Sequence, residues 1–152
     1  MPIAAATYEV DSSIQKAFSD FMVTQPIQPK IIWDNVGFNP ANDATPVTST
    51  DPQVTGKGWI LFQLLHAEGE IAALGTTINR HVGVLGASIY FETNRGRIRS
   101  TSKIADQILN FYQTVDVAGV RKYNPRKVAV GSDRQGWWQV NVLADFQYDI
   151  KR

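Results

Sequence analysis

The chain has no cysteine, only two histidines and no long apolar run among its 152 residues. Without cysteine there is no disulfide framework, no thiolate metal site and no cysteine nucleophile. His66 and His81 lack the spacing and the H-E-x-x-H context of a zinc site, so we predict that no metal is bound. No segment approaches the roughly 20 apolar residues of a membrane span, and the first residues lack a basic secretory n-region. We therefore expect a protein that is made in the cytoplasm and has no membrane contact.

Motifs for nucleotide binding and catalysis are also missing. Gly56-Lys57-Gly58 has neither the glycine spacing nor the following Ser or Thr of a phosphate loop. Ser88 lies within a strand-like run and lacks the second glycine of a nucleophile elbow. Glu68 and Glu70 are two nearby carboxylates, but nothing around them would raise one pKa to make an acid. We predict that the protein is not an enzyme and takes no cofactor.

The composition is that of an ordinary globular domain. The chain is 43% hydrophobic and 19% charged, and a domain of this length buries roughly two thirds of its unfolded surface. It contains no internal repeat and no low-complexity tract. We predict one domain over residues 1–152.

The segment 79–115 predicts a central strand followed by an amphipathic helix. From His81 to Glu92 the residues alternate, and both faces carry apolar groups, which is typical of a central strand. After the turn Asn94-Arg95-Gly96, apolar residues recur every three or four positions, which is typical of a helix packed on a sheet. The helical stripe consists of Ile98, Thr101, Ala105, Ile108, Tyr112 and Val115.

The remaining periodic segments predict an α+β fold. Glu9–Phe21 has a helical apolar stripe that ends before Pro26. Strand-like segments are Lys30–Trp33, Trp59–Leu65, Lys127–Gly131 and Gly136–Ile150. We expect two helices packed on a mainly antiparallel sheet.

Two segments should depart from this compact unit. Residues 35–58 show no period and predict a long loop, either a surface excursion or a functional arm. Residues 66–76 predict the tip of a projecting hairpin centred near Gly69. The tip carries Glu68 and Glu70, whose first interpretation is as solvated side chains.

Charge is unevenly distributed along the chain although the net charge is only +1. Residues 1–76 hold eight acidic and three basic side chains, whereas residues 77–152 hold six acidic and twelve basic ones. Chance and intrachain pairing would explain this asymmetry. A subunit with an acidic side and a basic side, suited to joining copies head to tail, would explain it as well.

Two clusters are candidate interfaces. Arg95, Arg97, Arg99 and Lys103 place four bases within nine residues, which indicates either a solvated face or an acidic protein partner. No RNP-like aromatic motif or recognition helix accompanies them, which argues against direct reading of nucleic-acid bases. Trp137 adjoins a turn beside Trp138, and one of the two should face outward, as an interface residue or a sugar-stacking platform.

Several segments in order resemble one known family, the tail terminator (tail completion) proteins of long-tailed bacteriophages, in the group similar to the lambdoid terminator. The segments are the opening helix, Trp33-Asp34-Asn35-Val36-Gly37-Phe38-Asn39-Pro40, Asn79-Arg80-His81-Val82-Gly83-Val84-Leu85, the turn at Gly96, Ala105-Asp106-Gln107-Ile108, and Gly136-Trp137-Trp138 through Tyr148-Asp149. The excursion between Asn39 and Gly58 is longer than the family pattern.

The resemblance implies the α+β terminator fold and a ring of six subunits at the head-proximal end of the virion tail. Such a ring caps the last tail-tube ring, stops polymerisation and presents a surface to the head-tail connector proteins, while genome DNA passes through the lumen without specific binding. We therefore assign Arg80, Arg95, Arg97, Arg99, Lys103 and Trp137 to interfaces, and Glu68 and Glu70 to the lumen. The alternatives are a head-completion or connector ring protein, a nucleic-acid-binding domain and a sugar-binding domain.

Overall fold

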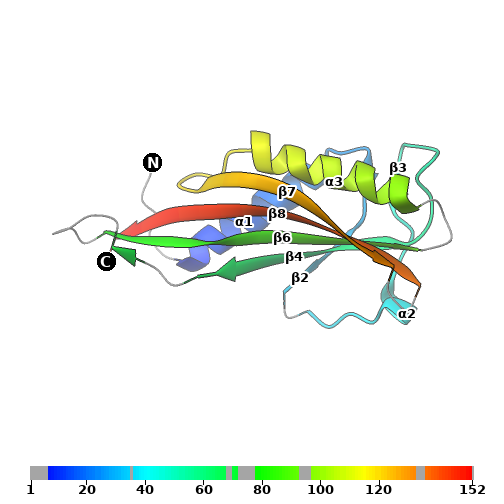
Figure 1. Ribbon diagram of the computed structural model, residues 1–152, viewed down its shortest axis with the longest axis horizontal. Helices are drawn as coiled ribbons and strands as arrows, with labels where there is room; N and C mark the ends of the chain where they lie inside the picture. Colours follow the sequence, from blue (N-terminus) through cyan, green and yellow to red (C-terminus); the bar gives the residue numbers. More distant parts are fainter. Residues whose placement is uncertain are drawn as a thin grey trace.

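The long strands run side by side and form one sheet in the computed structural model, which describes residues 7–34, 36–67, 70–71, 78–92, 97–132 and 136–151 (Figure 1). The strand order is β2-β4-β6-β8-β7, and the short β5 also pairs with β6. All pairs are antiparallel except β2–β4, which is parallel. The strands are β2 (Lys30–Trp33), β4 (Gly58–His66), β5 (Glu70–Ile71), β6 (Ile78–Glu92), β7 (Arg121–Ser132) and β8 (Trp137–Lys151).

Two main helices pack on this sheet. They are α1 (Thr7–Met22) and α3 (Arg97–Thr114). The prediction of a single α+β domain with two helices on a mainly antiparallel sheet is therefore confirmed. A short helix, α2 (Pro40–Asp43), and a separate two-stranded pair of β1 (Ile27–Gln28) and β3 (Thr48–Ser49) complete the described elements.

The main core lies between the helices and one face of the sheet, which we call the helix-covered face. Phe18 of α1 stacks on Phe62 of β4 with ring centroids 4.3 Å apart, and it meets Phe111 of α3 edge-on at 5.2 Å. One aromatic side chain thus joins both helices to the sheet. Burial of each such ring contributes about 1.5–3 kcal/mol before entropy is counted.

Strand β6 is the central strand, as predicted. Its residues Leu85, Ala87, Ile89 and Phe91 are fully buried on the helix-covered face. The opposite face, which we call the open face, carries the alternate residues, of which Val84, Ser88 and Tyr90 are only partly buried. Among the described residues, the expectation of protein on both sides of β6 is met on the open face near Tyr90, where residues 36–44 pack against the sheet.

Strand β7 begins earlier than predicted. The sequence predicted a strand only from Lys127 to Gly131, but β7 starts at Arg121. Asn124 has φ of 54°, and the register with β8 shifts between Tyr123 and Arg126. This bulge interrupts the two-residue alternation, so the sequence pattern does not reveal the first half of the strand.

The segment 35–58 is mostly irregular, as predicted for a loop, but its described residues are attached to the domain. It contains α2 and β3, and Asp51 forms an ion pair with Lys103 of α3. The neighbouring β1 is also fixed to α3, because Gln107 donates to the Ile27 carbonyl (2.8 Å) and accepts from its N–H (3.2 Å). Side chains of α3 therefore hold this region.

The predicted hairpin tip at 66–76 requires a correction. Glu70 lies in β5 and pairs with Arg80 of β6, so it belongs to an arm of the hairpin and not to its turn. The expectation placed the turn at the glycine, whereas backbone pairing continues beyond it. Gly69 and residues 72–77 lie outside the described residues.

Candidate interaction surfaces

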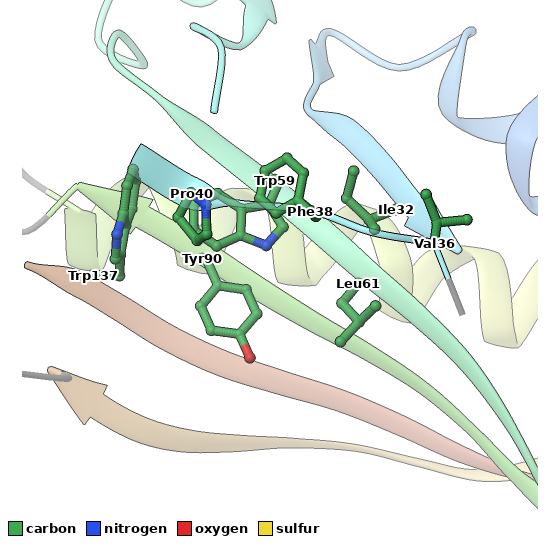
Figure 2. Close-up of a pocket in the computed structure, with 8 residues that line it drawn as sticks. All are labelled: Ile32, Val36, Phe38, Pro40, Trp59, Leu61, Tyr90 and Trp137. Atoms are coloured by element: carbon green, nitrogen blue, oxygen red, sulfur yellow. The ribbon is translucent and has the colours of Figure 1, made fainter. Parts of the chain in front are cut away.

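A groove on the open face is the most distinctive surface of the described chain. It has a volume of about 350 Å³ and collects side chains from β2, β4, β6, β8 and the segment around α2 (Figure 2). We call it the aromatic groove. Its lining residues are Ile32, Val36, Phe38, Pro40, Trp59, Leu61, Tyr90 and Trp137.

Trp59 forms the base of the aromatic groove and is 5% exposed. Its indole stacks on the ring of Tyr90 (centroids 4.8 Å apart, planes at 12°) and meets Trp137 edge-on at 4.5 Å. Phe38 packs on it from the loop, with centroids 5.0 Å apart. Figure 2 shows Trp137 at one end of the groove and Val36 at the other, with Trp59 between them.

The local sequence explains why these rings gather. Trp59 and Leu61 alternate with Ile60 and Phe62, which face the helices, so they project from the open face. Asn39 begins α2 by accepting a hydrogen bond from Ala41 N (3.2 Å). This N-cap fixes the turn that brings the loop residues over β4.

Trp137 is partly buried in this groove, whereas Trp138 packs against the main core on the opposite face. The two indoles therefore lie on opposite faces of the sheet, but neither is exposed, and the interface role of Trp137 stays a prediction. The groove walls are mainly aliphatic and aromatic, and a sugar would need several polar groups to bind its hydroxyls. The lining therefore suits an apolar side chain better than a carbohydrate.

Few charges border the aromatic groove. Lys30 Nζ lies 5.6 Å from the Phe38 ring centroid. Asp34 accepts a hydrogen bond from Leu64 N (3.3 Å), and Asp43 accepts one from Asn39 N (2.8 Å). Two carboxylates and one ammonium group thus lie in the segments that form its rim.

The outer strand β7 is a second candidate surface, which we call the basic edge strand. It contains four basic residues and no acidic residue. Val128 and Val130 are 47% and 55% exposed, unusual values for strand valines. Pro125 and two register shifts interrupt the strand, as in edges that avoid continuous pairing with another strand. The edge is therefore suited to side-chain contacts.

Some charges of the basic edge strand already have partners. Arg126 donates to Asp145 (3.2 Å), and Lys127 lies 3.9 Å from Asp106. Lys122 donates to the carbonyl of Val115, and its partial burial lowers the pKa of the ammonium group. Arg121 is exposed and lies over the ring of Tyr123.

The predicted basic cluster around Arg95 is not brought together as one free surface. Arg95 lies outside the described residues, and Arg97 is the first residue of α3 with its side chain outside the described set. Arg99 is exposed. Lys103 pairs with Asp51, and this hydrogen bond lowers the pKa of the Asp51 carboxyl. Lys103 thus holds the chain's own loop.

Arg80 lies far from that cluster along the sheet. Its Nε and Nη2 donate to the two carboxylate oxygens of Asp149 at 2.9 and 3.1 Å. This bidentate pair joins β6 to β8 in register and lowers the pKa of Asp149. Its observed role is therefore within the sheet, and any interface role remains a prediction.

The lumen assignment of the two acidic residues is not tested by the geometry. Glu68 lies outside the described residues, and of Glu70 only the backbone pairing with Arg80 is described.

The histidines occur in separate local contacts. His66 Nε2 lies 3.0 Å from Asp11 Oδ1, and the His81 ring stacks on Tyr148 at 5.3 Å. In the described part of the chain, no three potential ligands gather as a metal site would require. No described helix is long and apolar enough to cross a membrane.

The sequence analysis missed the aromatic groove apart from Trp137. A signal was present, because Trp59, Leu61 and Leu65 make the second face of β4 apolar as well. Phe38 in the aperiodic segment was another signal. Their convergence depends on the parallel pairing of β2 with β4, which no local pattern specifies.

Comparison with known proteins supports the fold and assigns no family. No family model matches the chain, and no curated protein is similar to it. One solved structure has a similar fold, with 12% sequence identity to this chain and a TM-score of 0.60. Its name is a sequence number and states no function. The similarity covers 95% of this chain and 96% of that chain. At this identity the likeness is one of fold alone.

Proposed function

We propose that the protein is a structural component of a bacteriophage virion that forms a ring at the head-proximal end of a long tail. The ring, a hexamer by resemblance, caps the tail tube, stops its polymerisation and provides the surface for joining the head. Its partners are other copies of the chain, the tail-tube protein and the head-tail connector proteins. Genome DNA passes through its lumen.

The observation that carries the proposal is that the segments with family resemblance meet in pairs. Trp33–Pro40 and Gly136–Trp138 are about a hundred residues apart, yet Phe38 and Trp137 both pack on Trp59. Asn79–Leu85 lies beside the end of β8, where Arg80 pairs with Asp149. Motifs of one shared structural unit are expected to converge in this way.

The distribution of charge over the sheet also supports a ring. The basic edge strand forms one border of the sheet. On the other side, β2 and α1 belong to the described segment 7–57, which apart from residue 35 holds six acidic and three basic side chains. Strand β2 itself holds Lys30 and no acidic residue, so the acidic excess lies in α1 and in the loop segments. Regions of opposite sign on one subunit favour head-to-tail association of identical subunits.

The two alternatives from other functional classes receive less support. A nucleic-acid-binding domain would use the cluster from Arg95 to Lys103, but Lys103 is engaged with Asp51. A sugar-binding domain would use Trp137, but that side chain lines a groove with mainly apolar walls.

The test is a phage in which this gene is deleted, with tails examined by electron microscopy. We expect overlong tails without heads, and wild-type protein supplied in trans should restore tail length and joining. Tails of normal length that lack heads would favour the head-completion alternative. Normal tails joined to heads would refute both ring functions.

A further inference from the structure

The aromatic groove and the exposed Val128 of the basic edge strand lie in the same cross-strand row. The register connects Ile32 to Leu61, Leu61 to Ser88, Ser88 to Asn141, and Asn141 to Val128. This row crosses the sheet from the groove at one side to the exposed valine at the other. Val128 and the groove are thus at the same level along the strands.

Val128 also projects from the same face as the groove. Its partner Asn141 alternates with Val140 and Val142, which are buried on the helix-covered face. Val130 follows two residues later, and the next row contains Trp59, Tyr90, Gln139 and Gly131. The second row ends at Gly131, and Val130 lies in the register shift between Ala129 and Gly131, next to that row. An apolar protrusion at Val128 and an apolar depression at Ile32 and Leu61 therefore occupy opposite ends of one row.

We propose that Val128 and Val130 of one copy dock in the aromatic groove of the next copy. This inference rests on the proposed ring function and identifies the two surfaces that join its subunits. The occupant is a second copy of this chain because the chain itself carries a matching apolar pair. A protrusion and a pocket on different parts of one surface produce a heterologous contact, which repeats from subunit to subunit.

The shared row favours a closed ring over a filament. A heterologous contact closes when each step is a pure rotation, and it forms a helix when each step also includes a translation along the axis. Two surfaces at the same level along the strands can meet with little axial displacement. For a ring axis along the strands, the register of the sheet is thus compatible with a contact that does not climb along the axis.

Charge at the two surfaces supports this orientation. The edge strand that carries the valines has four basic residues and no acidic one. The segment that contributes Ile32, Val36, Phe38 and Pro40 to the groove also holds Asp34 and Asp43, with Lys30 as its base. A second edge strand would instead place bases against bases, so a symmetric contact between two edge strands is disfavoured.

Three variants test the docking. The edge variant combines Val128→Asp and Val130→Asp, and the groove variant combines Val36→Asp and Leu61→Asp. Leu65→Asp is the matched control, because Leu65 is on the same face of β4, is 54% exposed and lies outside the groove lining. Circular dichroism shows whether each variant folds. If the double change in the groove prevents folding, Val36→Asp alone replaces the groove variant, because Val36 is 54% exposed.

The measurement is sedimentation equilibrium of purified proteins. We expect the edge and groove variants each to weaken self-association by about tenfold or more, as changes at central interface residues do, whereas the control assembles like wild type. An equal mixture of edge and groove variants retains one intact contact per pair. It should form a heterodimer that grows no further.

The outcomes separate the docking from the proposed function. A symmetric edge contact would make the groove variant assemble normally, which would overturn the proposal. Two results together would also overturn the docking. The wild-type protein would be a monomer at the highest measurable concentration, and the edge and groove variants would both restore tail length in the deletion phage. The terminator function would then stand without this contact. Loss of assembly in both variants, in a protein whose deletion leaves tails normal, would support the docking and refute the function.

Discussion

The two faces of the sheet are built from the same strands but are buried to very different extents. On the helix-covered face of β6, Leu85 and Phe91 are completely buried. On the open face of that strand, Val84 and Tyr90 remain partly exposed. The first face is closed by two helices of the same chain, whereas in the described part of the chain the second is covered around the aromatic groove alone.

This difference separates two roles of apolar residues. Apolar area that is removed from water within the chain stabilises the fold, at about 25 cal/mol per Å². Apolar area that stays exposed, such as Val128 and Val130, contributes little to folding and is available for association. Substitutions on the two faces should therefore change different measurements, namely unfolding free energy on one and association on the other.

The largest effect is expected for Phe62→Ala on the helix-covered face. Phe62 is 1% exposed and stacks on Phe18. Removing the ring should lower the free energy of unfolding by about 3–5 kcal/mol, a large part of the stability of a typical domain. Urea denaturation at low protein concentration measures this without a contribution from association.

Leu65→Ala is the matched change on the open face of the same strand. Leu65 is 54% exposed, so its truncation should alter stability by no more than about 0.5 kcal/mol. Equal losses for Phe62→Ala and Leu65→Ala would show that the two faces do not differ as described.

A smaller effect should distinguish two glycines of β6. A Cβ at Gly83 would lie 2.4 Å from the Leu65 carbonyl oxygen and 2.7 Å from the Phe146 ring. At Gly86 the nearest neighbour is Leu143 Cδ2 at 3.5 Å, which is ordinary contact. Gly83→Ala should destabilise by about 1–3 kcal/mol because backbone and ring must both shift.

Gly86→Ala provides the control for that change. It lowers the entropy of the unfolded chain without a clash, so it should be neutral or stabilising by up to about 1 kcal/mol. Thermal unfolding of both variants gives the comparison. A Gly83→Ala protein as stable as wild type would refute the steric reason for glycine in the Arg-x-x-Gly segment at 80–83.

The helix-covered face could be predicted largely from sequence, because each helix or strand that forms it has a regular spacing of apolar residues along its length. The stripe from Val10 to Phe21 and the alternation in β6 record directly which residues are buried. The predicted strand boundaries were wrong where the two-residue alternation was interrupted, as at the Asn124 bulge. The predicted position of Glu70 was wrong because Gly69 was interpreted as the turn of the hairpin, whereas Glu70 itself pairs with Arg80.

The open face could be predicted only in part because its features depend on long-range pairing. Trp137 was identified from its outward position, but its neighbours Phe38 and Trp59 come from distant segments. Four bases near Arg95 were grouped by sequence proximity alone. The ion pair of Lys103 with Asp51, 52 residues away, cannot be inferred from that spacing.

A smaller effect than that of Gly83→Ala is expected at the Arg80–Asp149 pair, which joins β6 to β8 through partly exposed side chains. Arg80 donates two hydrogen bonds to Asp149, and these bonds lower the pKa of the folded carboxyl below its unfolded value of about 3.9. The pair therefore contributes its full stability above the unfolded pKa, and the contribution is lost as pH falls through the folded pKa. The side chains of Arg80 and Asp149 are 33% and 16% exposed, so water weakens the interaction.

Asp149→Asn should therefore lower the free energy of unfolding by at most about 1 kcal/mol at pH 7. Urea midpoints measured from pH 7 downward should approach those of wild type, because protonation of the Asp149 carboxyl progressively removes the charge that the asparagine side chain lacks. Asp20→Asn is the control, since the Lys16–Asp20 pair is far more exposed, at 76% and 64%, and its loss should be smaller at pH 7. A difference between Asp149→Asn and wild type that persists unchanged at the lowest pH would mean that Asp149 acts through packing and not through its charge.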